Sequence, residues 1–297
     1  METYAVVRAH GVKSRLLSKQ DYEALVAGTR RIWEFPDYTH ILEQDPLEKK
    51  LEKAYKVYID RMTLLAKISK FPDLIFALLD WLEVENIKFH LRLITGYQRQ
   101  VLYYPYGRLL GLEKLKSLSS ESLIWEALSA TPLKAPAPRT HAFMTGLIAE
   151  REAFLEILYF GYLVNTIINL KWQRNIAATV IDFVTSNFTV RYAYWIKLLP
   201  ENIVGSIIER YAPGLKVHSE LLKSLEGTPT EILQRGGRML ALRAVREARK
   251  HPLDPVYVCA LNYLLLLEAQ NIERILMSKE LGVPEEIIFK NLILPYT

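Results

Sequence analysis

Apolar residues recur at helical spacing along nearly the whole chain, and this pattern limits the possible folds more than any other feature of the sequence. Between positions 47 and 65 they follow one another at steps of three and four residues. Asp45-Pro46 suits the N-cap and first position of that helix, and Asp254-Pro255 opens a second long stretch in the same way. No segment shows the strict alternation of a half-buried strand. The sequence therefore predicts an all-α fold.

Short motifs also recur along the chain in a constant order. Asn187 and Asn271 are each followed, after thirteen residues, by a Pro-Glu pair. The other matches are Tyr22–Leu25 with Trp125–Leu128, Thr39-His40 with Thr140-His141, Asn86 with Asn187, and Thr39–Leu42 with Thr230–Leu233. This order predicts three related helical modules, at residues 1–107, 108–212 and 213–297.

Several predicted helices have marked ends. Ser18 and Asp21 resemble a capping box at the start of a helix. Gly282 is a natural stop at the end of the last long helix. Pro200 and Pro284 suit the first turns of two short helices, because proline lacks the N–H that is unpaired there. The second and third modules are therefore each expected to end in a long helix, a tight turn and a short helix.

The composition is typical of a folded protein from a reducing compartment. Half of the residues are apolar, 24% are charged, and the single cysteine, Cys259, excludes an intrachain disulfide. The first residues do not show the apolar core of a signal peptide, and we expect no membrane span because no stretch of roughly 20 residues is predominantly apolar. The chain is therefore expected to be soluble or peripheral to a membrane. A net charge of +5 is compatible with an acidic partner, nucleic acid or an anionic membrane surface.

Motifs of catalysis are scarce in this sequence. It has no glycine-rich phosphate loop, no HExxH pair and no Asp-Asp pair, and its six histidines are scattered. Cys259 stands between Val258 and Ala260 and is expected to be an inert core residue. We therefore predict a non-catalytic protein with no cofactor and no bound metal. An all-α enzyme is the alternative, and it would require carboxylates such as Glu83, Asp182 and Glu268 to converge.

A second pattern is a carboxylate and an amide three residues apart on one helix face. The residues are Glu83 with Asn86 in the first module, Glu268 with Asn271 in the third, and Asn187 with Val184 in place of the acidic residue in the second. Two interpretations are open. These side chains satisfy neighbouring backbone groups or pair with an arginine, or they line a common cavity and contact a partner.

A third pattern is a basic stretch at positions 233–252. Its arginines follow one another at helical steps: Arg235, Arg238, Arg243, Arg246 and Arg249. The stretch is either a solvated helix face or an electropositive surface for an acidic helix or for phosphate. Its low aromatic content makes it a poor stacking platform for single-stranded nucleic acid.

Both ends of the chain resemble one family. The resemblance rests on Tyr4, Arg8, Lys13–Ser18, Asp21–Glu23, Leu25 and Tyr38-Thr39, and on Glu268, Asn271-Ile272, Arg274, Leu276, Lys279, Gly282 and Pro284-Glu285. These segments resemble the C subunit of archaeal and bacterial A/V-type ATP synthases, whose eukaryotic counterpart is subunit d of the vacuolar proton pump. The shared order of motifs and the all-helical composition extend the resemblance over essentially the whole chain.

The resemblance implies a funnel of three similar helical domains with pseudo-threefold symmetry. In this family the funnel is a non-catalytic central-stalk subunit of a rotary motor, in which ATP synthesis or hydrolysis is linked to ion transport. It receives the end of the central shaft, rests on the membrane proteolipid ring at the cytoplasmic face, and transmits torque. No nucleic acid is expected as a partner and no self-association is required. The candidate partner contacts are Glu83, Asn86, Asn187, Glu268, Asn271, Arg235, Arg238, Arg246 and Arg249.

The alternative to this interpretation is a basic all-helical repeat protein that binds nucleic acid through the arginines at positions 235–249. It would bind less tightly as salt rises, because neutralising phosphates releases counterions.

Overall fold

The computed structural model describes residues 2–96, 102–136 and 146–295, and every regular element in these ranges is helical. The all-α prediction is confirmed. The chain divides into two compact units, Met1–Ile75 with Gly237–Thr297, and Phe76–Gly236. We call them unit 1 and unit 2.

Unit 1 contains the two ends of the chain. Its elements are α1 (Glu2–Lys13), α2 (Lys19–Ala27), the 3-10 helices η1 (Ile32–Glu34) and η2 (Pro36–Tyr38), α3 (Leu47–Ile68), α12 (Pro255–Glu280) and α13 (Glu285–Asn291). Unit 2 contains α5 (Leu112–Ser117), α6 (Glu121–Ser129), α7 (Ile148–Asn169), α8 (Arg174–Trp195), α9 (Glu201–Tyr211) and α10 (Ser219–Lys223). Helices α4 (Pro72–Ile94) and α11 (Pro229–Lys250) contribute residues to both units.

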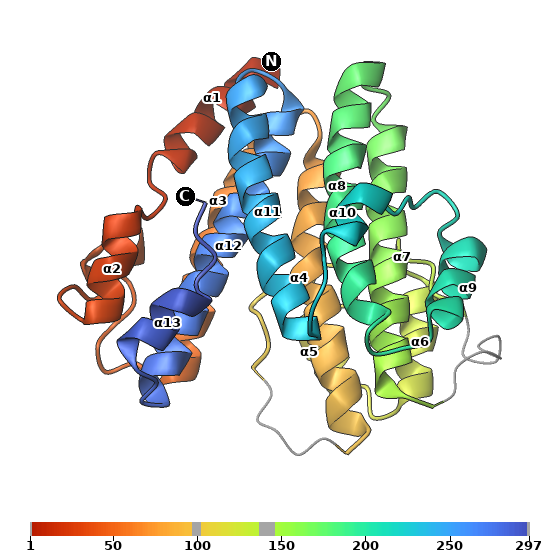
Figure 1. Cartoon of the computed structure of the whole chain (residues 1–297), viewed down its shortest axis with the longest axis horizontal. Coiled ribbons are helices and arrows are strands. Elements are labelled where there is room, and N and C mark those ends of the chain that lie inside the picture. The colour runs from red at the N-terminus through yellow and green to blue at the C-terminus, as the bar shows by residue number, and fades with distance from the viewer. Residues whose placement is uncertain (1, 97–101, 137–145, 296–297) are drawn as a thin grey trace. The chain divides into compact units, whose positions relative to one another are not determined.

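The order of helix lengths along the chain repeats three times (Figure 1). Two short helices precede two long ones in each case: α1 and α2 before α3 and α4, α5 and α6 before α7 and α8, and α9 and α10 before α11 and α12. The long helices have 22 or 23 residues, except α12 with 26. The repeat of sequence motifs therefore has a counterpart in the order of the helices.

The match between α2 and α6 extends to their caps. Both helices have nine residues, and Ser18 and Ser120 cap them through side chains that accept a backbone N–H. Tyr22 and Trp125, which the sequence repeat makes equivalent, are both buried. By contrast, Thr39–Leu42 is a turn after η2 whereas Thr230–Leu233 lies in the first turn of α11, so this predicted correspondence is wrong in local structure. Thr140-His141 lies outside the described residues.

Most of the predicted helix ends are confirmed. Ser18 and Asp21 form a reciprocal capping box, and the Asp254 side chain accepts the backbone N–H of Val256. At the other end of α12, Gly282 has φ 68°, and the N–H groups of Gly282 and Val283 bond back to Lys279 and Ser278. This is a Schellman motif, which satisfies carbonyls that a helix end leaves unpaired.

The predicted Asp45 cap is wrong. The N-cap of α3 is Pro46, which has no side chain to donate or accept. The Asp45 carboxylate instead accepts the Leu42 N–H at 2.8 Å and lies 2.5 Å from the Lys53 ammonium. The lysine competes successfully for the carboxylate because it offers a full positive charge. The predicted short helices are present, and Pro200 and Pro284 lie at their N-caps, one position before the predicted place.

The core of unit 1 forms where α12 packs against α1, α3 and α13. Figure 1 shows α12 in blue beside α3 in orange. Apolar side chains from α2, the two 3-10 helices, α3, α12 and α13 form a continuous buried cluster, with Tyr22, Phe35, Tyr38 and Ile272 among its members. The N-terminal quarter of the chain is therefore fixed onto the C-terminal helices.

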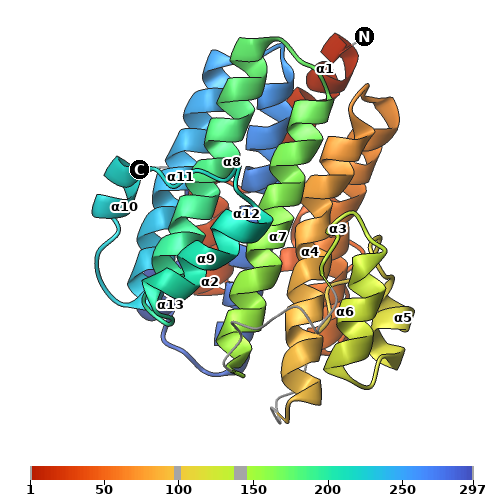
Figure 2. The same ribbon diagram turned by 90° about the vertical axis from the view of Figure 1, so that its right-hand side faces the viewer.

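The core of unit 2 forms around α7, which packs along α8 and also contacts α9 (Figure 2). Aromatic rings of Trp81, Tyr159, Phe160 and Phe188 meet there at centroid distances of 5.2 to 5.9 Å. The apolar stretch at 153–170 is thus largely a buried helix, as expected. None of the helices in the described ranges has the length and apolar character needed to span a membrane.

Two helical glycines provide a matched test of the packing. A Cβ added to Gly236 on α11 would overlap Val190 of α8, with Cγ2 at 2.7 Å and Cβ at 3.1 Å. We expect Gly236→Ala to lower the free energy of unfolding by about 1–3 kcal/mol, as overpacking does. Gly205 on α9 has open space around it, so Gly205→Ala should be neutral or stabilise by up to about 1 kcal/mol. Urea unfolding followed by circular dichroism measures both, and equal effects would contradict this packing.

Candidate functional site

The Glu83 and Asn86 side chains on α4 hold the segment that follows this helix in unit 2. The Glu83 carboxylate accepts the backbone N–H groups of residues 108, 109, 110 and 111 at 2.5 to 2.9 Å. Asn86 accepts the N–H of Tyr104 at 2.7 Å and donates to its carbonyl at 3.0 Å. Both side chains are buried. Residues 104–111 are therefore fixed by two side chains one helical turn apart.

Glu268 and Asn271 on α12 make comparable contacts in unit 1. Asn271 accepts the Ile293 N–H at 3.1 Å and donates to the Ile293 carbonyl at 2.8 Å. Glu268 accepts the Leu17 N–H at 2.6 Å, the Tyr38 hydroxyl at 2.7 Å and a guanidinium N–H of Arg61 at 2.7 Å. Asn86 and Asn271 thus pair with a downstream backbone residue in the same two-bond geometry.

The second module departs from this geometry, as Val184 in place of a carboxylate suggests. Asn187 on α8 is half-buried. The downstream segment is bound instead by hydroxyls, since the Thr189 Oγ1 accepts the His218 N–H at 3.0 Å and the Thr185 Oγ1 lies 2.7 Å from the His218 ring. Thr189 thus makes one hydrogen bond to the backbone of this segment, where Asn86 and Asn271 each make two to one residue.

These contacts agree with the first interpretation of the paired carboxylates and amides, in which they satisfy backbone groups or pair with an arginine of the same chain. The polar atoms of Glu83, Asn86, Glu268 and Asn271 are used by backbone groups and by arginine or tyrosine of the same chain. Their role in partner contact stays a prediction. Within unit 2, Glu83 is enclosed by amides whereas Asp182 is exposed near His218, at 3.7 Å from its ring. In the described residues no group of three or more His, Cys, Asp or Glu side chains could hold a metal ion.

Exposed arginines make one face of α11 strongly basic. Arg235, Arg238, Arg246 and Arg249 are exposed, while Leu240, Ala244 and Ala248 are buried on the opposite side. The sequence reading missed two large apolar side chains on the exposed face, Met239 and Leu242, which are 38% and 43% exposed. Met239 and Leu242 stand four residues after Arg235 and Arg238, and this helical spacing could have placed them on the same face. We call these six exposed residues the α11 face.

A buried ionic network in unit 2 was also missed. Glu156 on α7 is fully buried and accepts hydrogen bonds from Lys88, Arg191 and Trp195. Burial raises the pKa of Glu156, but the two cations outweigh it, and the pKa falls from 4.5 to about 2. Its partners lie on α4 and α8, so the network ties three long helices together. The carboxylate is therefore ionised at neutral pH.

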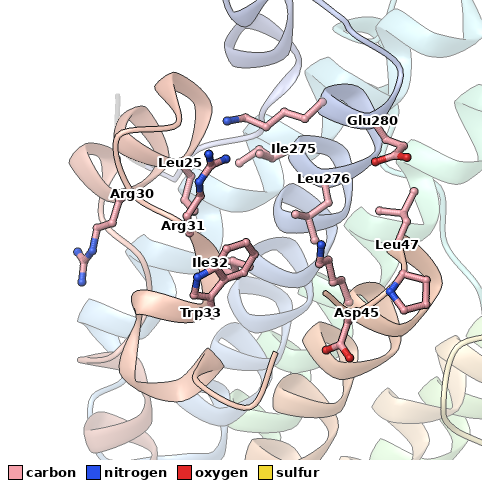
Figure 3. Close-up of a pocket in the computed structure, with 13 residues that line it drawn as sticks. Leu25, Arg30, Arg31, Ile32, Trp33, Asp45, Leu47, Ile275, Leu276 and Glu280 are labelled. Carbon is pink, nitrogen blue, oxygen red and sulfur yellow. The ribbon is translucent and has the colours of Figure 1, made fainter. Parts of the chain in front are cut away.

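A basic cleft of about 340 Å³ lies within unit 1 (Figure 3). The end of α2 and η1 form one wall, the start of α3 a second, and the last turns of α12 the third. Its charged residues are Arg30, Arg31, Lys50, Lys279, Asp45 and Glu280, and its apolar residues are Leu25, Ile32, Trp33, Pro46, Leu47, Ile275 and Leu276. In Figure 3 Arg30 points away from the centre of the cleft and Arg31 points toward Ile275.

Cys259 is a buried core residue, as expected. It is buried on α12, and burial followed by the charge of Asp254 raises the pKa of its thiol to about 12. The raised pKa disfavours a nucleophilic thiolate at this position.

Comparisons with known proteins assign no family. No protein-family model and no curated protein sequence matches the chain.

Proposed function

We propose that the chain is the non-catalytic central-stalk subunit of a rotary A/V-type ATP synthase, a socket between the rotating shaft and the membrane proteolipid ring. The observation that supports this most is the threefold order of two short and two long helices. The number of groups is the number of modules that the family resemblance implies, although α9 lies inside the predicted second module, residues 108–212, and the third group would begin with it. In this proposal the modules surround a common axis as a funnel.

The internal contacts suit a part that carries torque. A coupling subunit must resist shear, and densely packed helices tied by buried polar networks deform little. In unit 2, Glu156 joins three long helices, and Asn86 fixes the segment after α4. In unit 1, Asn271 fixes the segment after α13. Unit 1 and unit 2 would therefore each resist internal deformation.

The α11 face is the surface that we assign to the shaft. Its exposed arginines surround Met239 and Leu242, and no acidic side chain is exposed between Arg235 and Arg249. An acidic amphipathic helix matches both the charge and the apolar centre of this face. Contact with the ring and the membrane surface, at the cytoplasmic side, would involve other faces of the subunit.

The test is co-purification of the tagged chain from native membranes in mild detergent, with the bound proteins identified by mass spectrometry. Recovery of shaft, head and proteolipid subunits is the expected result. The double variant Arg238→Glu/Arg246→Glu should lose the shaft subunits by roughly tenfold or more, because reversed charges repel an acidic helix. Arg238→Lys/Arg246→Lys is the matched control and should retain them. Failure of the wild-type chain to bind shaft subunits at any salt concentration would overturn the proposal.

The exposed arginines also favour nucleic acid as the second candidate. This function predicts that the purified chain binds duplex DNA or RNA with an affinity that falls steeply with salt. Recovery of nucleic acid without motor subunits would select it.

A further inference from the structure

We propose that the basic cleft of unit 1 binds an acidic segment of a partner polypeptide, in which a bulky apolar side chain is flanked by carboxylates. The cleft is separate from the α11 face, since none of its lining residues belongs to α11. The inference therefore does not depend on the shaft being the partner of that face.

The side chains that line the cleft carry a net positive charge. The Asp45 carboxylate is already neutralised by Lys53 at 2.5 Å. Among the described residues, the side chains of Arg31, Lys50 and Lys279 form no ion pair, and Glu280 is the remaining acidic group of the lining. Three cations thus face one carboxylate, and a ligand that brings negative charge would be held by them.

The ammonium groups of two of these cations lie close to other walls of the cleft. The Lys50 ammonium lies over the Trp33 ring, 5.5 Å from its centroid. The Lys279 ammonium reaches the end of α2, 3.3 Å from the place that a Cβ on Gly28 would occupy. Burial, and then repulsion from Arg31, lowers the pKa of Lys279, and the charge of Glu285 opposes this only in part. A carboxylate placed between Arg31 and Lys279 would relieve this repulsion.

The volume and the apolar lining of the cleft favour a single side chain over a large ligand. A volume of about 340 Å³ is at the lower end of the range of small-molecule pockets. Trp33, Leu47 and Leu276 line it with apolar surface. An aromatic or large aliphatic side chain fills such a space, while neighbouring carboxylates reach the cations at the rim.

A polypeptide fits this surface better than a nucleic acid does. A phosphate backbone carries a negative charge at every nucleotide and would meet the Glu280 carboxylate at the same rim. A peptide can place its carboxylates selectively beside Arg31, Lys50 and Lys279 and present an apolar group to Trp33. The partner is therefore an acidic peptide segment.

The experiment measures fluorescence anisotropy of a short labelled peptide in which a Phe stands between pairs of Glu residues. We expect the purified full-length chain to bind it. Lys50→Glu and Lys279→Glu should each weaken binding by roughly tenfold or more, since the new carboxylate repels the peptide. Glu280→Gln is the matched control on the same rim and should bind the peptide equally well or more tightly.

The peptide itself also has a matched control in which every Glu is replaced by Gln. Equal binding of both peptides, or unchanged binding by the two charge-reversal variants, would overturn the proposal. Displacement of the acidic peptide by millimolar inorganic phosphate would identify an anion site without peptide selectivity and would also overturn it. If a reversal variant unfolds, judged by its circular dichroism, Lys50→Gln and Lys279→Gln replace it, with a smaller loss expected.

Discussion

Replacing Glu156 with glutamine is expected to lower the free energy of unfolding by about 3–5 kcal/mol, the cost of leaving a buried cation without its partner. Arg191 donates two hydrogen bonds to this carboxylate, and Lys88 and Trp195 donate one each. The amide of the glutamine would keep the volume and one acceptor but not the charge. Lys88 keeps Glu85 at 2.8 Å, so Arg191 bears most of the loss.

Urea unfolding, followed by circular dichroism, measures this loss against a control one turn away on the same helix. Glu152 is also buried, but its partner Arg92 has a side chain that is 40% exposed, so water can solvate the unpaired guanidinium and Glu152→Gln should cost less, about 1–2 kcal/mol. Comparable losses in the two variants would contradict the assignment of Glu156 as the centre of the network.

The same carboxylate makes stability depend on pH in a defined direction. Its pKa is 4.5 in an ordinary environment and about 2 in the folded chain, where the pull of Arg191 and Lys88 exceeds the effect of burial. The unfolded chain therefore binds this proton at higher pH than the folded chain does. The stabilisation is complete above about pH 4.5 and is lost as the pH falls toward 2.

The comparison that isolates this effect is between wild type and Glu156→Gln across that pH window. The difference in unfolding free energy between the two should shrink as the solution is acidified. A difference that stays constant from pH 5 down to the acid limit of folding would show that Glu156 is not the titrating group.

Local features of the fold could be predicted from the sequence because their causes lie within a few residues. Ser18 and Asp21 are three positions apart, and their capping box depends on nothing else. Gly282 ends α12 because its own backbone adopts a positive φ. Helix existence follows from the spacing of apolar residues in the same way.

The Asp45 cap failed because a side chain eight residues away competes for the carboxylate. The prediction considered only neighbours in the first turn. The error is small, one residue at the start of α3, but it removes the helix cap that the motif indicated.

The ionic network and the basic cleft could not be predicted, for a different reason. Lys88, Glu156 and Arg191 stand far apart in the chain, and each alone looks like an ordinary charge on a helix. The cleft combines residues from near position 30, near position 47 and near position 279. Only tertiary packing brings such groups together, and periodicity carries no information about it. The pairs Glu83 with Asn86 and Glu268 with Asn271 could be found because the pattern repeats in the sequence. The backbone groups that they bind could not be predicted.

Glu83→Ala is the second change with a large expected effect, about 3–5 kcal/mol, because one carboxylate satisfies four backbone N–H groups. Each N–H left without a partner costs about 1–3 kcal/mol when buried, and part-buried amides recover some of this from water. Gly111, with φ 87°, completes the turn of the chain around the carboxylate. Loss of the carboxylate should release residues 104–111 locally before the rest of unit 2.

Hydrogen exchange of the amides at positions 108–111 therefore distinguishes this role from a general loss of stability. In Glu83→Ala these amides should exchange at least roughly tenfold faster under native conditions, while amides of α7 change only as far as global stability falls. Glu113→Gln, two residues beyond the bound segment and almost fully exposed, is the control and should stay within about 0.5 kcal/mol of wild type. If the 108–111 amides exchange at the wild-type rate in Glu83→Ala, the carboxylate does not hold this segment in solution, and the equivalence drawn between the helices α4 and α12 loses its energetic basis.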